Sequence, residues 1–291
     1  MVINKHGSFY LRNGWGTKII KAVDEDEMIF TPTNEQLAID TVGLGRVMIK
    51  ALRYWSVAMG LTVEEKTKTG IKQRKTDLFD YIDKNDPFFQ KKGSLFLLHR
   101  NLSNNIDEAT AWYWLFNEYN GDSISKDMFT ESFHSFLIVN DTNIKKNAVE
   151  KEFNCLKNTY IGERKVDAKI AMDDDTYPFF APLRILYIDS EKKIAKRHLT
   201  KSDIPLEVLM YCIAKDNGEK SKNCGQVNIE YLLEEKGQVG KYLNMKYSKL
   251  LEALIEAENK SMIRLNNNFG NKYIEFEEYD YDSLLDKYYK G

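Results

Sequence analysis

The sequence contains only three cysteines, Cys155, Cys212 and Cys224, which lie far apart and form no Cys-x-x-Cys pair. This argues against a disulfide framework or a thiolate zinc site, and is typical of reduced thiols in a cytoplasm of the prokaryotic type. The chain also lacks an apolar run of the ~20 residues that cross a bilayer, and its first residues show no long apolar segment of a secretory signal. We therefore expect a cytoplasmic protein with no membrane contact.

Motifs of several common enzyme classes are missing too. There is no Gly-x-Ser-x-Gly, and the four histidines show no spacing typical of metal ligands. Gly43 and Gly45 suggest a phosphate loop, but Met48 stands where a dinucleotide-binding motif needs a third glycine, and the preceding segment is predicted as a helix. No Gly-Lys-Ser/Thr follows this turn either. These absences exclude a nucleotide-binding loop here.

Charge is distributed unevenly along the 291 residues, whose formal net charge is −2. Residues 1–76 carry 12 Lys and Arg against 8 Asp and Glu, whereas the rest of the chain is acidic. The composition is 43% hydrophobic and 30% charged, which is ordinary for a globular chain long enough for two or three domains. Any contact with a polyanion is therefore expected near the N-terminal end.

The elements predicted at this end follow the order of a winged helix-turn-helix. Helices are predicted over residues 14–28, 34–42 and 46–59 from their apolar periodicity and glycine stops. Two short strands, LTVEEK and IKQRKT, follow with a turn between them. Helix, helix, tight turn, helix and hairpin is the plan of this DNA-binding motif.

The rest of the chain divides into a helical part and a repetition of the first pattern. Residues 77–165 are helical in pattern throughout, and NIEYLLEE, MKYSKLLEALIEAEN and SMIRLNNNFGNKYIEFEEY predict two helices and a hairpin. The predicted fold class is mainly α with small β-hairpins (α+β). We expect a winged helix-turn-helix DNA-binding domain over 1–85, a central helical bundle over 86–165, and a linker with a C-terminal winged-helix-like domain over 166–291.

The third predicted helix has one basic side. Arg46, Lys50 and Arg53 fall in a stripe roughly 60° wide, and apolar residues occupy the opposite side. In a winged helix this element lies in the major groove of DNA, and the wing contacts the adjacent backbone. Five more cations lie in the predicted wing: Lys66, Lys68, Lys72, Arg74 and Lys75. A solvated face or a protein-docking surface would have the same pattern, so these alternatives stay open.

Two further features have both a structural and a functional interpretation. The segment AWYWLFNEYN gathers aromatic side chains that are typical of a core, with Glu118 as an acid at its end. Glu118 is equally well explained as a metal ligand or as a buried hydrogen-bond anchor. Asp173, Asp174 and Asp175 offer the oxygen ligands that Mg²⁺ prefers, although a run of acids is also typical of a solvated loop. The residues of any metal site stay unknown from the sequence.

Three segments carry a family resemblance: HGSFYLRNGWGTK, VGLGRVMIKALRYWSVAMGL and LHRNLSNNIDEATAWYWLFNEYN. They resemble, in this order, the opening motif, the Gly-rich turn with its basic helix, and the Trp-Tyr-Trp-Leu-Phe-Asn-Glu segment of one prokaryotic family. That family has long been catalogued as a domain of unknown function, and it includes SspB of the Ssp DNA phosphorothioation defence system. The resemblance is dense over residues 6–120 and thinner beyond. The chain departs from the family at Gly7, where an acidic residue is usual.

The resemblance implies a DNA-binding protein with nicking endonuclease activity, in which hydrolysis of a phosphodiester opens the backbone for sulfur incorporation. Its motifs imply catalytic roles for His6 as acid or base, for Arg12 at the developing charge, and for Glu118 as a ligand of Mg²⁺, which would not be bound tightly. The implied partners are double-stranded DNA, a cysteine desulfurase, an ATPase and a sulfur-transfer enzyme related to PAPS reductases. A second copy of the chain is a further candidate partner.

Three functions stay open at this point. A nickase needs the proposed catalytic residues, whereas a non-catalytic adaptor that binds DNA and recruits the sulfur-transfer enzymes needs only the Lys and Arg side chains. A winged-helix transcriptional regulator needs contacts to base edges, which the sequence does not establish.

Overall fold

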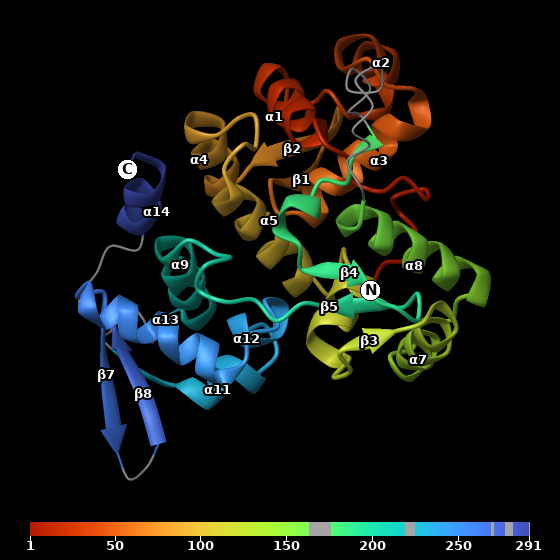
Figure 1. Ribbon diagram of the computed structural model, residues 1–291. Helices are drawn as coiled ribbons and strands as arrows, with labels where there is room; N and C mark the ends of the chain where they lie inside the picture. Colours follow the sequence, from red (N-terminus) through yellow and green to blue (C-terminus); the bar gives the residue numbers. More distant parts are fainter. Residues whose placement is uncertain (163–175, 219–224, 269–270, 277–281, 291) are drawn as a thin grey trace, which may run out of the picture.

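The computed structural model of the protein describes residues 1–162, 176–218, 225–268, 271–276 and 282–290. Helices dominate, and small antiparallel sheets occur at three places among these residues (Figure 1). The N-terminal part lies at the top of this view and the C-terminal hairpin at the lower left. This arrangement confirms the predicted fold class, mainly α with small β-hairpins. In the part of the chain that is described, no helix combines the length and the apolar character needed to span a membrane.

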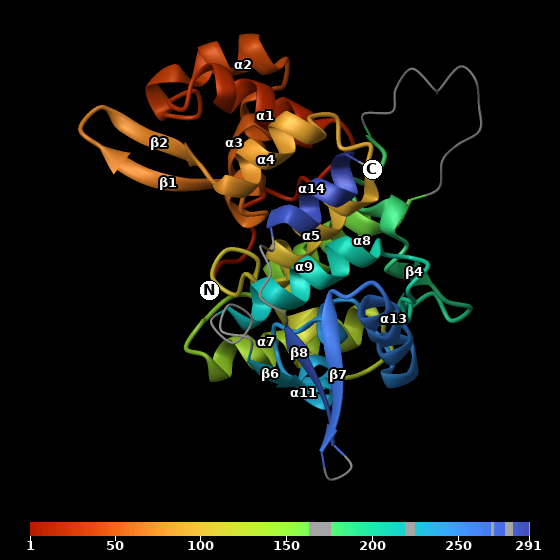
Figure 2. The same cartoon turned by 90° about the vertical axis from the view of Figure 1, so that its left-hand side faces the viewer.

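The N-terminal unit has the predicted order of helices and hairpin. Its elements are α1 (Trp15–Glu25), the 3₁₀-helix η1 (Pro32–Asn34), α2 (Glu35–Val42), α3 (Arg46–Ala58), β1 (Thr62–Thr67) and β2 (Gly70–Lys75). Gly43 ends α2 and Gly60 follows α3, both at the positive φ that glycine adopts without strain. β1 and β2 pair as an antiparallel hairpin that projects from the unit as a wing (Figure 2).

The two sides of α3 differ as its sequence pattern predicts. Ile49, Leu52 and Trp55 are buried, and α3 packs on both α1 and α2. Burial of each such side chain contributes about 1.5–3 kcal/mol. Because this side is held in the core, Arg46 and Lys50 on the other side are exposed.

The middle of the chain is helical, as predicted, with an irregular turn at one point. Its elements are α4 (Asp77–Asn85), α5 (Lys92–Asn104), α6 (Thr110–Tyr113), the π-helix η2 (Trp114–Glu118), the short strand β3 (Ser123–Ile124), α7 (Lys126–Val139) and α8 (Lys146–Tyr160). The aromatic segment is core: Trp112 is buried and meets the ring of Trp55 edge to face at 5.3 Å. The π-helix was not predicted, and such turns occur frequently at functional sites.

A second small sheet connects segments that are distant in sequence. The 3₁₀-helix η4 (Ala181–Leu183) precedes β4 (Leu186–Ile188) and β5 (Ile194–Lys196), and the strand order is β3-β5-β4. Ser123 pairs with Ala195, so this sheet joins residues on both sides of the domain boundary predicted at 165. The predicted boundary itself lies outside the described residues, which omit 163–175.

The C-terminal unit is winged-helix-like, as predicted. It comprises α9 (Leu206–Asn217), β6 (Gln226–Asn228), α11 (Ile229–Glu234), α12 (Val239–Tyr242), α13 (Tyr247–Asn259), β7 (Ile263–Asn268) and β8 (Asn271–Phe276), with strand order β6-β8-β7. The last helix, α14 (Asp282–Lys290), packs on α9, and Gly93 N on α5 donates to Tyr288 Oη at 2.9 Å. Buried apolar residues of all three parts belong to one connected core.

Candidate nucleic-acid interface

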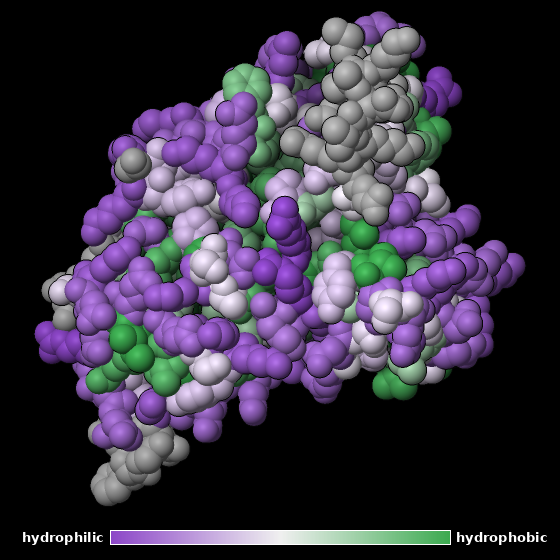
Figure 3. All heavy atoms as spheres, viewed as in Figure 1, coloured by the Kyte–Doolittle hydropathy of each residue, from purple (hydrophilic) through white to green (hydrophobic). Residues whose placement is uncertain are grey.

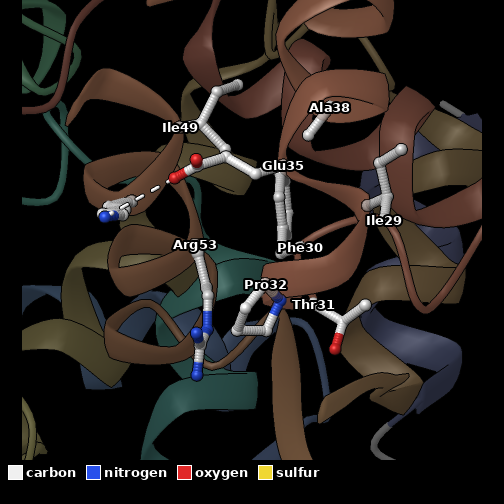
Figure 4. Close-up of a pocket in the computed structure, with 9 residues that line it drawn as sticks. Ile29, Phe30, Thr31, Pro32, Glu35, Ala38, Ile49 and Arg53 are labelled. Atoms are coloured by element: carbon white, nitrogen blue, oxygen red, sulfur yellow. Dashed lines mark ion pairs between the residues drawn. The ribbon is translucent and has the colours of Figure 1, made fainter. Parts of the chain in front are cut away.

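Arg46 and Lys50 project from α3 and share one carboxylate. Arg46 Nε lies 2.8 Å from Glu35 Oε2. Lys50 Nζ lies 3.5 Å from Glu35 Oε1, and the dashed line in Figure 4 marks this second ion pair. The two cationic side chains are 66% and 68% exposed. Exposed ion pairs of this kind contribute at most about 1 kcal/mol. A phosphate could therefore replace Glu35 at little cost, and one carboxylate leaves the pair of cations with a net positive charge.

Arg53, the third cation of the stripe, is held more firmly. Its Nε and Nη2 donate to the two carboxylate oxygens of Glu64 on β1, at 2.6 and 2.8 Å. Gln73 on β2 donates to the same carboxylate at 3.0 Å. The Arg53 side chain is 26% exposed, so it braces α3 against the wing and offers less surface than its two neighbours.

The five predicted cations of the wing divide into paired and unpaired groups. Lys72 Nζ lies 2.7 Å from Glu27 Oε2, and Lys75 pairs with Asp24 of α1. Hydrogen bonds to these acids raise the pKa of both lysines. The other three are Lys66, Lys68 and Arg74, which are exposed and have no ion-pair partner in the described part of the chain. The free charge of the wing therefore belongs to these three side chains.

Two hollows flank Lys50 and Arg53. One, of about 190 Å³, lies between η1, α2 and α3 and has apolar walls such as Phe30 and Ile49 (Figure 4). The other, of about 470 Å³, lies beside β1 and includes Lys5. Since both cations border both hollows, the exposed side of α3 forms a ridge between them. A ridge of this kind is the shape needed by a helix that enters a groove of DNA.

His6, a predicted catalytic residue, is buried beneath α3. Its ring stacks on Trp55 with centroids 6.1 Å apart, and its Nδ1 accepts a hydrogen bond from Ser8 N at 3.1 Å. Nε2 lies 3.1 Å from Glu152 Oε2 but has no hydrogen-bond partner among the described residues. Both side chains are almost fully buried, so His6 has no direct access to a DNA backbone in this structure.

Arg12 and Glu118 lie elsewhere in the molecule. The Arg12 guanidinium lies over the ring of Tyr10, 4.9 Å from its centroid, and its Nε is buried without an acceptor among the described residues. Glu118 ends the π-helix η2, and both its carboxylate oxygens lie 2.8 Å from Lys236 Nζ. No hydrogen bond, ion pair or ring contact in the described chain joins any two of His6, Arg12 and Glu118. Their catalytic roles stay predictions.

The described part of the chain offers few candidate ligands for a magnesium ion. Among them, no group of three or more His, Cys, Asp or Glu side chains is arranged to hold a metal ion. Asp173, Asp174 and Asp175 lie outside the described residues. A magnesium site therefore stays a prediction, and the candidate interface in the described chain consists of cations.

The sequence pattern identified the cations but not the acids that pair with them. Glu35 lies on the neighbouring helix, and Glu64 reaches Arg53 only because the hairpin folds back beside α3. Lys5 was not predicted either, although it borders the larger hollow and pairs with Glu108 at 3.0 Å. A cation five residues from the N-terminus carries no local signal that places it beside α3.

Comparisons with known proteins agree with this architecture. A solved structure of magnesium ion-bound SspB has a TM-score of 0.85 at 20% identity, covering 99% of this chain and 88% of that one. A second SspB crystal structure has a TM-score of 0.84 at 21% identity, with the same coverage. These likenesses establish a shared fold, and no curated protein matches the chain. The family model described as "Protein of unknown function (DUF4007)" matches residues 3–289, and the chain belongs to this family.

Proposed function

We propose that this protein binds double-stranded DNA through α3 and the β1–β2 wing, as the DNA-binding component of a phosphorothioation-type defence system. The observation that supports this most is the exposure of Arg46 and Lys50 on one side of α3, next to a wing with three cations that have no ion-pair partner in the described chain. Phosphate contacts from such side chains supply most of the affinity of non-specific DNA binding. Binding would release counterions from the backbone and weaken as salt rises.

The assignment to a phosphorothioation system rests on two supports. The first is the sequence resemblance of three motifs to the family that includes SspB, and the second is the fold shared with SspB over 99% of this chain. In such a system the DNA-binding component would work with a cysteine desulfurase, an ATPase and a sulfur-transfer enzyme related to PAPS reductases.

The geometry favours the adaptor version of this function over a nickase built from His6, Arg12 and Glu118. Hydrolysis of a phosphodiester requires its acid, base and charge-neutralising groups to meet within hydrogen-bond reach of one phosphate. His6 is in the core, and no contact in the described chain links it to the other two.

The DNA-binding proposal is tested by fluorescence anisotropy with a short labelled duplex at low salt. The double variant R46A/K50A is expected to bind about tenfold or more weakly, because two phosphate contacts are lost. The matched control is K126A/K146A, which removes two exposed, ion-paired lysines on α7 and α8. Equal affinity of the two double variants would refute binding through α3.

A plasmid assay separates the adaptor from the nickase. The purified protein is incubated with supercoiled plasmid and Mg²⁺, and the open-circle product is measured. The adaptor predicts no product above background. Product that persists in a His6→Ala variant and disappears with Glu118→Gln would instead establish a nicking activity that depends on Glu118.

A further inference from the structure

Three lysines converge on three consecutive residues at the end of the π-helix η2. Lys236 pairs with Glu118, Lys196 Nζ donates to the carbonyl oxygen of Tyr119 at 2.6 Å, and Lys241 Nζ donates to Asn120 Oδ1 at 3.0 Å. The lysines come from β5 and from the α11–α12 region, whereas the residues that they contact run from the last residue of η2 into the loop that follows it. None of these lysines was part of the predicted interface.

Lys196 and Lys241 differ from Lys236 because neither forms an ion pair with a described residue. Lys196 is 8% exposed, and lysines are almost never fully buried unless they are paired. Each ammonium has three N–H donors, and each of these two has one protein acceptor in the described chain. The site therefore has two positive charges and several unused donors close together.

The carboxylate of Asp122 acts on Lys196 from a distance and raises its pKa, but it forms no ion pair with either lysine in the described chain. Asp122, in the same loop, lies 3.7 Å from His198 Nε2 rather than in contact with either lysine, and its side chain is 77% exposed. The two ammonium groups bind adjacent residues, Tyr119 and Asn120. Burial lowers the pKa of Lys196, the positive charge of Lys241 lowers it further and Asp122 acts in the opposite direction, so that the pKa is about 8. Hydrophilic residues cover this face of the molecule between α12 and β5 (Figure 3).

We propose that Lys196 and Lys241 form a binding site for a phosphate group, distinct from the interface on α3. The backbone amide of Lys196 donates to the carbonyl oxygen of Asp122 at 2.8 Å, and the aromatic ring of Tyr119 lies 5.3 Å from Lys196 Nζ. The first contact holds the backbone of Lys196 and the second places its ammonium group beside the ring, while Nζ donates to one protein acceptor in the described chain and has further N–H donors for the anion. One phosphate could accept charge-assisted hydrogen bonds from both ammonium groups and so supply acceptors and negative charge to both lysines. The phosphate could belong to a nucleic-acid backbone or to a free phosphate.

The first experiment measures binding of inorganic phosphate by isothermal titration calorimetry. The wild-type protein is expected to bind it, and Lys196→Met and Lys241→Met are each expected to weaken binding about tenfold or more. Lys126→Met, on the exposed surface of α7, is the matched control and should bind as the wild type does. Circular dichroism confirms folding of each variant. Absence of phosphate binding, or equal binding by all four proteins, overturns the proposal.

A second arm uses sulfate, which does not titrate, at pH 7.5 and pH 9. Lys196 loses its proton over this interval, so wild-type affinity should fall severalfold, whereas Lys196→Arg keeps its charge and should change less. Burial raises the pKa of Tyr119, which therefore stays neutral here, and the other nearby groups, Asp122, Lys193 and His198, are present in both proteins. The same pH response in wild type and Lys196→Arg would contradict the assignment to Lys196.

The source of the phosphate follows from a third arm with duplex DNA. If Lys196→Met and Lys241→Met weaken DNA binding in the R46A/K50A background, the site holds the DNA backbone; if only inorganic phosphate binding falls, it holds a free phosphate. Either result supports the site once the first experiment has shown that these lysines bind inorganic phosphate. Because the inorganic phosphate arm contains no DNA, its failure is distinguishable from failure of DNA binding through α3.

Discussion

Arg53 of α3 and Glu64 of β1 form a bidentate ion pair, with distances of 2.6 and 2.8 Å, that fixes the helix against the wing. Burial raises the pKa of Glu64, but hydrogen bonds from Arg53 and Gln73 outweigh this and lower it overall. The carboxylate is therefore ionised at neutral pH. It adds a negative charge to a surface that, in our account, receives phosphates.

Removing this charge should strengthen DNA binding. Glu64→Gln keeps the shape of the side chain but leaves the charge of Arg53 without a counter-charge. We therefore expect severalfold tighter binding of duplex DNA at low salt, and a smaller gain in affinity at higher salt because salt screens the charges. Fluorescence anisotropy measures this effect. Glu131→Gln is the control, because Glu131 pairs with Lys146 on a different part of the molecule. Weaker binding by Glu64→Gln would mean that alignment of Arg53 matters more than its charge.

The start of β2 depends on a glycine at Gly70. This residue has a φ of 150°, and a Cβ there would lie 1.9 Å from Thr31 Oγ1, which accepts a hydrogen bond from Ile71 N. Gly70→Ala should therefore lower the free energy of unfolding by about 1–3 kcal/mol through strain and displacement of the wing. Denaturant unfolding measures the change. Gly45→Ala is the control, since a Cβ there comes no closer than 3.8 Å to another residue, Met48; an equal loss in both variants would refute this explanation.

Buried His99 should make stability depend on pH. Burial lowers the pKa of His99 from 6.5 to about 4, although the hydrogen bond to the Tyr242 carbonyl oxygen acts in the opposite direction. The unfolded chain then binds more protons than the folded one at acidic pH. The contribution of neutral His99 to the free energy of unfolding is therefore complete above pH 6.5 and is lost as the pH falls through about 4. The expected loss is about 3 kcal/mol. Denaturant unfolding at pH 7 and near pH 4 should show a smaller loss for His99→Gln, and an equal loss would contradict this cause.

Asp216 should be essential for attaching the C-terminal unit. It accepts from Arg100 Nε at 2.6 Å and from Tyr242 Oη at 2.7 Å, and so joins α5, α9 and α12. Asp216→Asn leaves the mostly buried Arg100 without a counter-charge, which should cost about 3–5 kcal/mol of unfolding free energy. The exposed pair broken by Glu131→Gln should cost less than about 1 kcal/mol in the same denaturant titration. Similar costs for the two changes would argue against a buried network.

The fold was largely predictable because local patterns determine most of its elements. The apolar face of α3 is fixed by the periodicity of Ile49, Leu52 and Trp55, and Gly43 and Gly60 mark the ends of α2 and α3 in the sequence itself. The C-terminal hairpin follows in the same way from alternating residues around an Asn/Gly-rich turn. These signals lie within a few residues of the elements that they predict.

The unpredicted features all depend on contacts between distant segments. β3 exists only because Ser123 and Ile124 pair with β5, seventy residues later. The proximity of Lys196 and Lys241 arises where the loop after η2 meets both β5 and α12. The predicted set of His6, Arg12 and Glu118 came from motifs in sequence order, and sequence order does not state whether motifs meet in space.

The salt dependence of DNA binding tests the central claim most directly. The slope of log Kobs against log[salt] counts the phosphates that the protein neutralises, at about 0.9 per contact on duplex DNA. If Arg46 and Lys50 each contact a phosphate, R46A/K50A should have a slope smaller by about 2 than that of the wild type, whereas K126A/K146A should not change it. An unchanged slope in R46A/K50A would contradict DNA binding through α3.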